Sequence, residues 1–307
     1  MKALLPTGDP EKLVHFQERP EPAPQPDEAV IAVEAFSVNR GEMFLLMRPK
    51  EGLLPGKDIA GRVVVAAADG SGPAVGTRVV AHPPKAGWAE RATVRTSSIA
   101  ELPDEVSFET AAALPLAGLT AIRLLRTAGS IVGKRILITG ASGGVGHYFV
   151  ELAHASGAEV TAVSGSAERG ERLTALGAAE VVHDVADATG RYDIVLESVG
   201  AESAPQALAK LRKRGQFIWF GQASREPATF SFFGFFAGPE SATVRHFHYA
   251  DSDEPDGVDL ATLVRLVHTD RLHPEIGRAE DWSLTSAILT DLRERRIRGK
   301  AVLRVGQ

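Results

Sequence analysis

The middle of the chain alternates between two hydrophobic periods. Ile136, Leu137 and Ile138 form a short run of branched apolar residues, which is typical of a strand buried on both faces of a parallel sheet. Apolar residues between such runs recur at helical spacing. The predicted strands are 136–138, 159–164, 180–182, 192–198 and 216–221. Repeated strand-and-helix units of this kind predict an α/β fold with a doubly wound parallel sheet, the Rossmann architecture.

The two ends of the chain show a different pattern. Residues 1–117 contain short strand-like runs bounded by Gly, Pro and Asp, which predict a β-rich lobe. A helical stretch over 107–129 follows, and we expect Pro115 to interrupt it. The C-terminal part predicts helices and a final strand, which would rejoin the first lobe. We therefore expect one domain from residues 1–117 and 256–307, with a second domain over 118–255.

A glycine-rich turn follows the first strand of the middle region. From Ala141 the pattern A-x-G-x-x-G places Gly143 and Gly146 where a dinucleotide-binding fingerprint has its second and third glycines. Gly143 lets a pyrophosphate approach the backbone, and Gly146 lets the following helix pack close to the strand. A tight turn without a ligand is the alternative, but four further strands at the required spacing favour a dinucleotide. The candidate cofactor-binding residues here are Ser142, Gly143, Gly144, Val145 and Gly146.

Composition excludes several classes of function. The 307 residues carry a formal net charge of −5, so no overall basic field favours nucleic acid. We interpret the arginine-rich segment 292–300 as a solvated helix face. The absence of cysteine excludes disulfides, thiolate zinc sites and a cysteine nucleophile, and it favours a reducing cytoplasm. Because no stretch approaches the ~20 apolar residues of a membrane span, we expect neither membrane insertion nor secretion.

Seven stretches, in this order along the chain, resemble one enzyme superfamily. They are SVNRGE (37–42), PGKDIAGRVV (55–64), GWAERATV (87–94), LPLAGLTA (114–121), ITGASGGVG (138–146), ESVG (197–200) and GKAVLRV (299–305). The chain resembles the medium-chain dehydrogenase/reductase superfamily, and within it the zinc-independent quinone oxidoreductase (zeta-crystallin-like) branch. This resemblance implies a β-rich GroES-like catalytic domain, a Rossmann domain inserted into it, and a cofactor in the cleft between them.

The zinc-dependent alcohol dehydrogenases of the same superfamily are the alternative. Where those enzymes have a Gly-His-Glu motif, this chain has Gly56, Lys57 and Asp58, and we expect the ammonium to pair with the carboxylate. His246 and His248 would share a face of a predicted strand, but a zinc site needs at least three protein ligands. The sequence therefore predicts no metal site.

The end of the second strand of the Rossmann pattern bears on cofactor choice. An NAD-preferring fold usually has an acidic residue there, whereas this chain has Ser164, Ser166 and Arg169. Two hydroxyls and a guanidinium suit a 2′-phosphate, which favours NADPH over NADH. In the branch that the chain resembles, a lysine commonly stands at position 169 and a tyrosine at position 184. Asp184 would weaken phosphate binding if it points inward, and Arg169 is equally compatible with a solvated helix position.

Other cofactor contacts follow from position or from the resemblance. Val199, Gly200 and Gly221 lie at the carboxyl ends of predicted strands, where open α/β sheets bind ligands. The resemblance places Thr120 near the nicotinamide carboxamide and Lys300 near the cofactor. The alternatives are a helix threonine bonded to its own backbone and a surface lysine.

The resemblance implies hydride transfer from NADPH to a quinone or to the β-carbon of an enone. Asn39 matches the asparagine of the family's N-x-x-D stretch and would donate an amide hydrogen bond to the substrate or to the nicotinamide ribose. Because Phe44 replaces a tyrosine common in the branch, the proton would come from water, from a 2′-hydroxyl or from Lys57. The phenylalanine-rich segment 230–236 would form an apolar wall over a substrate cleft, and packing in the core or at a dimer interface is the alternative. The candidate substrate-pocket residues are Phe44, Phe233 and Phe236.

The sequence therefore predicts a cytoplasmic, zinc-independent NADPH-dependent quinone or enone reductase. We expect a homodimer joined along the sheet edge near residues 243–250, because an exposed edge strand needs a partner or a cover. Two alternatives remain at this point. One is an alkenal or enoyl reductase, and the other is an NADPH-binding redox sensor without efficient turnover.

Overall fold

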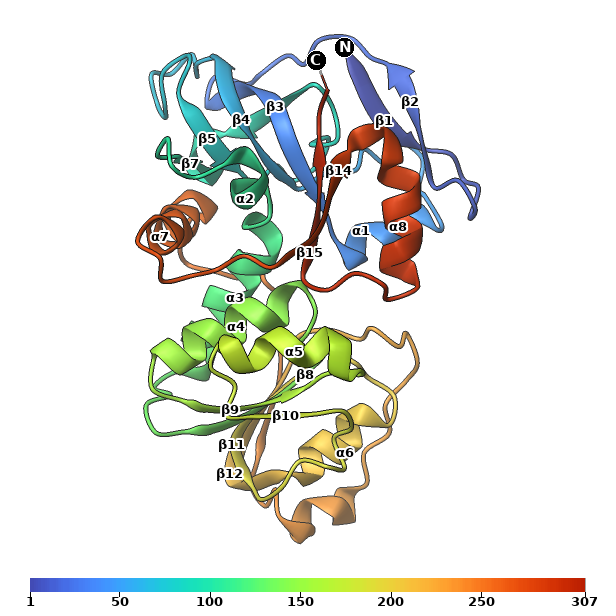
Figure 1. Ribbon diagram of the computed structural model, residues 1–307, viewed down its shortest axis with the longest axis vertical. Coiled ribbons are helices and arrows are strands. Elements are labelled where there is room, and N and C mark those ends of the chain that lie inside the picture. Colours follow the sequence, from blue (N-terminus) through green and yellow to red (C-terminus); the bar gives the residue numbers. More distant parts are fainter. Residues whose placement is uncertain (307) are drawn as a thin grey trace. The chain divides into compact units, whose positions relative to one another are not determined.

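The computed structural model describes residues 1–306, which fall into two compact units (Figure 1). Unit 1 combines Met1–Leu119 with the segment from Asp253 onward, and unit 2 is the intervening stretch Thr120–Ser252. The hydrophobic patterns predicted these junctions after residues 117 and 255. Each unit has its own sheet and its own buried core.

Unit 2 is built on a six-stranded parallel sheet with the order β10-β9-β8-β11-β12-β13. The chain starts at the centre, moves to one edge, returns and proceeds to the other edge, which confirms the predicted doubly wound Rossmann sheet. The strands are β8 (Arg135–Thr139), β9 (Glu159–Val163), β10 (Glu180–Val182), β11 (Tyr192–Glu197), β12 (Leu211–Trp219) and β13 (Thr243–His246). The helices α4 (Gly144–Ala155) and α5 (Ala167–Ala175) pack on β9, and α6 (Ser203–Ala209) packs on β11 and β12.

Unit 1 is built on a seven-stranded, mainly antiparallel sheet. Its order is β14-β15-β3-β4-β5-β7, and β6 also pairs with β3. The last strand pairs antiparallel with β3, with Leu303 opposite Phe36, which confirms that the C-terminal strand rejoins the first lobe. The strands are β3 (Glu28–Val38), β4 (Asp58–Val65), β5 (Arg78–Ala81), β6 (Arg91–Arg95), β7 (Ile99–Glu101), β14 (Ile276–Asp281) and β15 (Lys300–Arg304). A separate hairpin consists of β1 (Lys2–Pro6) and β2 (Val14–Glu18).

The helices of unit 1, and α3 (Pro115–Ala128), which runs from unit 1 into unit 2, follow local sequence signals. As expected, the helical stretch is interrupted: α2 (Phe108–Ala112) ends before Pro115, which becomes the first residue of α3. Proline suits that position because its fixed φ fits a helix start and its missing N–H has no acceptor there. The remaining helices are α1 (Arg40–Leu46), α7 (Asp256–His268) and α8 (Thr285–Arg293).

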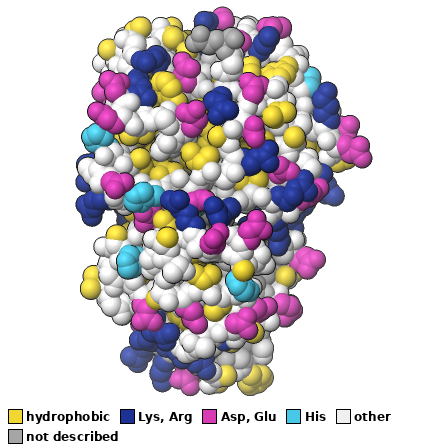
Figure 2. All heavy atoms as spheres, viewed as in Figure 1, with side chains coloured by type: hydrophobic (Ala, Val, Ile, Leu, Met, Phe, Trp, Pro, Cys, Tyr) yellow, Lys and Arg dark blue, Asp and Glu magenta, His cyan; other side chains and the backbone are white. Residues whose placement is uncertain are grey.

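Two sequence expectations about local structure are wrong. The arginine-rich segment 292–300 is not a helix face, because α8 ends at Arg293, and Arg295 and Gly299 both take positive φ, which a helix does not allow. The two histidines do not share a strand face either, since β13 ends at His246 and His248 lies beyond it. Basic and acidic side chains are interspersed over the face drawn in Figure 2.

Candidate active site

The glycine turn of unit 2 joins β8 to α4. Gly140 takes a φ of +63°, and a Cβ there would lie 2.7 Å from the Ser198 hydroxyl. A Cβ on Gly146 would overlap the backbone of Ala141. The turn and the helix therefore approach one another because side chains are missing at these positions, and for Gly146 this is the close packing that the sequence predicted.

The first turn of α4 offers free amide donors. Gly143 is its N-cap residue and brings no side chain that would cap the helix. The amides of Gly144, Val145 and Gly146 precede the first residue that can bond four positions back, so helix geometry leaves them available. Ser142 beside them is buried. Three amide donors at the positive end of a twelve-residue helix fit a pyrophosphate.

A buried carboxylate organises the carboxyl ends of β11 and β12. Glu197 has no exposed surface and accepts hydrogen bonds from the amides of Val199 and Gly200, both at 2.7 Å. Burial raises the pKa of this carboxyl despite these bonds. Gly221 packs against Ser198 in the same place, where its missing Cβ would lie 3.1 Å from that side chain. The structure thus brings together the three residues predicted at these strand ends, and Glu197 is the group that sequence reasoning overlooked.

The end of β9 gives a different result for the predicted 2′-phosphate residues. Ser164 has no exposed surface, and its hydroxyl donates to the carbonyl of Ser166 at 3.0 Å. Ser166 caps α5, and its hydroxyl accepts from the amide of Arg169 at 3.4 Å. The Asp184 carboxylate accepts from the amide of Ala186 at 2.8 Å, within its own turn. The burial and internal hydrogen bond of Ser164 count against its predicted direct contact with the phosphate, whereas Ser166 and Arg169 keep partial exposure.

Unit 1 contains a buried polar cluster around Asn39, the N-cap residue of α1. The Lys300 ammonium donates to Asn39 Oδ1 at 2.6 Å, while Asn39 Nδ2 donates to Asp58 at 2.8 Å and to Glu42 at 3.1 Å. An ammonium only donates and carboxylates accept, so this network fixes the orientation of the amide. Both amide hydrogens are used inside the protein. Asn39 therefore has only an acceptor position left for a ligand, which corrects its predicted role as a donor.

Asp58 is the centre of this cluster. It has no exposed surface and accepts from the Ser37 hydroxyl at 2.7 Å, from the Leu116 amide at 2.9 Å and from Lys300 at 3.1 Å. Burial alone would raise the pKa of Asp58, but the Lys300 ammonium and then His82 outweigh it and hold that pKa below its ordinary value. The ammonium bonded to this carboxylate is thus the distant Lys300, which is 2 % exposed and is no surface lysine.

His82 and Glu42 complete the cluster. His82 Nδ1 lies 2.6 Å from the Lys57 carbonyl and 3.6 Å from Asp58, so this nitrogen carries the hydrogen. Glu42 accepts from the amides of Gly56 at 3.0 Å and Asn39 at 3.1 Å. Burial, and then the charge of Asp58, nevertheless raise the pKa of Glu42 to about 7. Two carboxyls close together thus have pKa values moved in opposite directions, an arrangement common at functional sites.

The remaining predicted residues differ in where they lie. Lys57 is half-buried beside Asp58, Thr120 is buried in α3, and Phe44 packs against the core of unit 1. Phe233 and Phe236 are 79 % and 65 % exposed. The 3₁₀ helix that carries them, Phe232–Ala237, is bonded through the carbonyl of Ala237 to Arg191, the residue before β11. This is the amino edge of the sheet, opposite the edge that holds the glycine turn, and it counts against a pocket role for both phenylalanines.

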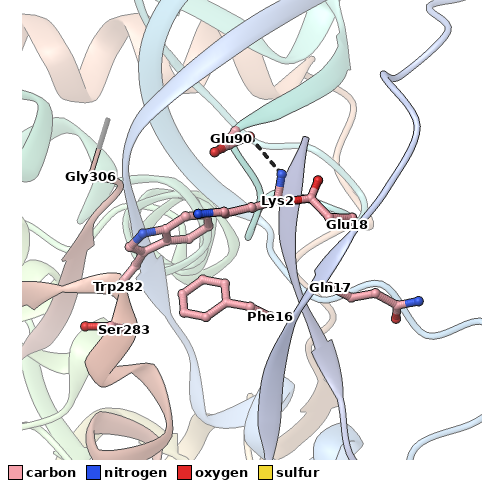
Figure 3. Close-up of a pocket in the computed structure, with 8 residues that line it drawn as sticks. All are labelled: Lys2, Phe16, Gln17, Glu18, Glu90, Trp282, Ser283 and Gly306. Atoms are coloured by element: carbon pink, nitrogen blue, oxygen red, sulfur yellow. Dashed lines mark hydrogen bonds between the residues drawn. The ribbon is translucent and has the colours of Figure 1, made fainter.

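A separate pocket of about 340 Å³ lies in unit 1 (Figure 3). Phe16 and Trp282 line it in edge-to-face contact, with ring centroids 4.7 Å apart. Glu90 at its rim accepts a hydrogen bond from the Lys2 amide at 2.7 Å. The described residues that line this pocket include none of the predicted site residues, so it is distinct from the polar cluster.

Two searches of residues 1–306 bear on metals and membranes. Within that range, His, Asp and Glu residues form no group of three or more arranged to hold a metal ion. Across the same residues, each helix is too short or too polar to cross a bilayer.

Comparisons with known proteins place this geometry in context. Residues 144–262 match the family model described as zinc-binding dehydrogenase. The chain is 38 % identical over 179 residues to the chloroplast envelope quinone oxidoreductase homolog of Arabidopsis thaliana, a match that covers 53 % of this chain and 54 % of that protein. It therefore spans about half the length of that relative. Quinone oxidoreductase of Mus musculus is 29 % identical over 233 residues, covering 70 % of each chain.

Solved structures resemble the chain over its whole length. The quinone oxidoreductase of Coxiella burnetii superposes with a TM-score of 0.84 at 25 % identity, covering 100 % of this chain and 99 % of the other. A mycobacterial protein complexed with NADPH superposes with a TM-score of 0.87 at 25 % identity, covering 99 % and 100 %. With the strand order of unit 2 and the antiparallel sheet of unit 1, these matches show that the chain shares the fold of these quinone oxidoreductases and is similar to them in sequence.

Proposed function

We propose that this chain is an NADPH-dependent reductase that transfers hydride to a quinone or a conjugated enone without zinc. The observation that carries the proposal is the uncapped first turn of α4 after a glycine turn in which Gly140 and Gly146 leave no room for side chains, because such a turn suits a pyrophosphate. Relatives named quinone oxidoreductases, and the mycobacterial neighbour that contains NADPH, support the choice of cofactor and acceptor.

Unit 2 would hold the cofactor. The amides of Gly144, Val145 and Gly146 would bind the pyrophosphate, and Ser166 and Arg169 would bind the 2′-phosphate. The nicotinamide half would lie along the carboxyl edge of the sheet. At that edge Val199, Gly200 and Gly221 would contact the nicotinamide half, and Thr120 would lie near the carboxamide.

Unit 1 would supply the polar groups of the reaction. The bound NADPH supplies the hydride, so the protein must orient the acceptor and stabilise a developing oxyanion. The buried Lys300 ammonium provides positive charge, and Asn39 and Asp58 hold it in position. We propose Lys57 as the proton donor, since it is half-buried beside this cluster and Phe44 cannot donate.

The residue types in and beside the cluster support zinc independence. Position 57 is an ammonium, the chain has no cysteine, and the cation bonded to Asp58 is Lys300. A lysine ammonium is not a zinc ligand, because zinc is bound by neutral nitrogen, thiolate or carboxylate groups. We expect turnover to survive prolonged dialysis against a strong chelator, and loss of activity that added zinc restores would refute this part of the proposal.

The activity is tested by following oxidation of NADPH and NADH with simple quinones, enones, an enoyl thioester and primary alcohols. We expect quinones or enones to be reduced, with NADPH preferred over NADH. Selective reduction of the enoyl thioester would favour an enoyl reductase. Tight NADPH binding without oxidation by any acceptor would favour the redox sensor instead.

We also propose a cytoplasmic homodimer. The four residues of β13, the outer strand of the unit 2 sheet, are all exposed, and Val244 shows 49 % of its surface. An uncovered edge strand of this kind invites pairing with a second copy. Light scattering at micromolar concentration should give twice the chain mass, and Val244→Lys should halve it; a wild-type monomer would refute the dimer. The location rests on the absence of cysteine.

A further inference from the structure

The carboxyl end of β9 is joined to two neighbouring segments by backbone hydrogen bonds. The amide of Ala141, in the glycine turn, donates to the carbonyl of Val163 at 3.0 Å. The amide of Ser164 donates to the carbonyl of Val182, the last residue of β10, at 2.9 Å. The glycine turn, the end of β9 and the end of β10 therefore lie together along one edge of the sheet.

His183 is the first residue after β10 and is exposed. Its Nδ1 lies 3.0 Å from the carbonyl oxygen of Ser164. A carbonyl oxygen only accepts, so Nδ1 carries the hydrogen and Nε2 is the ring atom left to address a ligand. The Ser164 hydroxyl is buried and donates to Ser166. The His183 imidazole therefore lies at this strand end, bonded to the Ser164 backbone, while the Ser164 hydroxyl is bonded inside the protein.

The carboxyl end of β9, the second strand of the sheet, has a known role in dinucleotide-binding folds. The residues after the second strand lie beside the adenosine ribose and decide between a 2′-hydroxyl and a 2′-phosphate. The acidic residue that would oppose a phosphate is missing here, and the carboxylate of Asp184 is bonded to the amide of Ala186 in its own turn.

We propose that His183 is a specificity-determining residue of this chain, binding the 2′-phosphate of NADPH together with Ser166 and Arg169. The inference rests on the NADPH binding proposed above. In the bound state the ring is an imidazolium, with Nδ1–H donated to the Ser164 carbonyl and Nε2–H donated to a phosphate oxygen. Such a charge-assisted hydrogen bond is stronger than one between neutral groups.

The test is a titration of the full chain with NADPH and with NADH by calorimetry. His183→Gln should weaken NADPH binding about tenfold, the value of one charge-assisted hydrogen bond, and leave NADH binding unchanged. His183→Lys should recover part of the NADPH affinity, because it restores a positive donor. His268→Gln, which changes an exposed histidine of α7 in unit 1, is the matched control and should change neither affinity.

The outcomes separate this inference from the proposed function. If wild-type protein prefers NADPH and His183→Gln keeps the same ratio of NADPH to NADH affinity, the role of His183 is refuted while NADPH binding stands. If wild-type protein binds the two cofactors equally, the inference about His183 is overturned as well. If it binds neither, the proposed function itself fails.

Discussion

Asp58 is the residue on which the polar cluster of unit 1 depends. It joins β3, α1, the start of α3 and β15 through Ser37, Asn39, Leu116 and Lys300. A buried charge is tolerated only when it is paired and hydrogen-bonded, and here each charge is the other's partner. The pair therefore links the final strand of the chain to its first lobe.

Removing one partner of this pair should be costly. Asp58→Asn leaves the buried Lys300 ammonium without its counter-charge, and we expect a loss of about 3–5 kcal/mol of stability. The double variant Asp58→Asn with Lys300→Met should cost about 1–3 kcal/mol less than the sum of the single variants, because neither charge is then left alone. Chemical denaturation of all four proteins measures this cycle. Additive costs would show that the two side chains do not act as a pair.

Glu42 makes stability depend on pH in a defined direction. Its pKa is about 7 in the folded chain against an ordinary value of 4.5. Between these values the folded state keeps a proton that the unfolded chain has released, so raising the pH through this window favours unfolding by up to ~1.4 kcal/mol per unit. The stabilising effect of that proton is complete below the unfolded pKa and is lost as the pH passes the folded pKa.

Glu42→Gln cannot titrate, so it should lack this slope. The side-chain amide of the variant has one acceptor oxygen in place of two, so it cannot accept from both the Gly56 and the Asn39 amides, which costs about 1–3 kcal/mol at low pH. The stability of the variant relative to wild type should then improve steadily as the pH rises from about 5 to 8. Denaturant midpoints at several pH values measure the difference. A constant difference across that range would mean that Glu42 stays ionised throughout.

The site residues differ in how far sequence could reveal them. Gly143 and Gly146 belong to a local pattern whose spacing carries its own physical meaning, and their positions follow from it. The partner of Asp58 could not be found from a local pattern. Lys57 is its neighbour in sequence, yet the ammonium bonded to it belongs to Lys300, which is 242 residues away in the chain. Only the antiparallel register of β15 on β3 brings that ammonium to the carboxylate.

Among the secondary-structure elements, strands and helices with a strong hydrophobic period formed where the sequence predicted them, and weakly patterned ones did not. Four of the five strands predicted for the Rossmann sheet are largely buried apolar runs, and the fifth, β10, is a three-residue edge strand in which only Val182 is buried. By contrast, β14 escaped prediction, since its residues are polar and mostly exposed at a sheet edge. The arginine-rich segment after α8 was misread because the positive φ at Arg295 is not evident from its residue type.

The glycine turn gives a matched pair of variants. Gly146→Ala places a methyl group into the Ala141 backbone and should destabilise unit 2. Gly143 has φ −83° and ψ 177°, which alanine adopts, and its Cβ would meet only the Gly140 carbonyl at 3.2 Å. Gly143→Ala should therefore keep its stability within about 1 kcal/mol yet weaken NADPH binding tenfold or more, because the methyl stands where the pyrophosphate approaches. Calorimetry and thermal melting together measure both effects, and equal loss of stability would contradict the assignment.

At the scale of the whole molecule, unit 2 is continuous in sequence and unit 1 is not. Unit 1 needs β14 and β15 to complete its sheet and Lys300 to balance Asp58. A fragment covering residues 115–252, which keeps all of α3, should therefore fold alone, whereas residues 1–119 should fold only when residues 253–307 are supplied. Circular dichroism and proteolysis of the three fragments check this. Independent folding of residues 1–119 would show that the discontinuous sheet is not required.

Hydride transfer from NADPH to a conjugated acceptor can be followed with an isotope. NADPH carrying deuterium at the transferable C4 position is incubated with the chain and a simple enone, in the presence of a chelator, and the product is analysed by mass spectrometry and NMR. We expect one deuterium on the β-carbon of the saturated ketone. Reduction without deuterium, or no oxidation of bound NADPH by any enone or quinone, would contradict it.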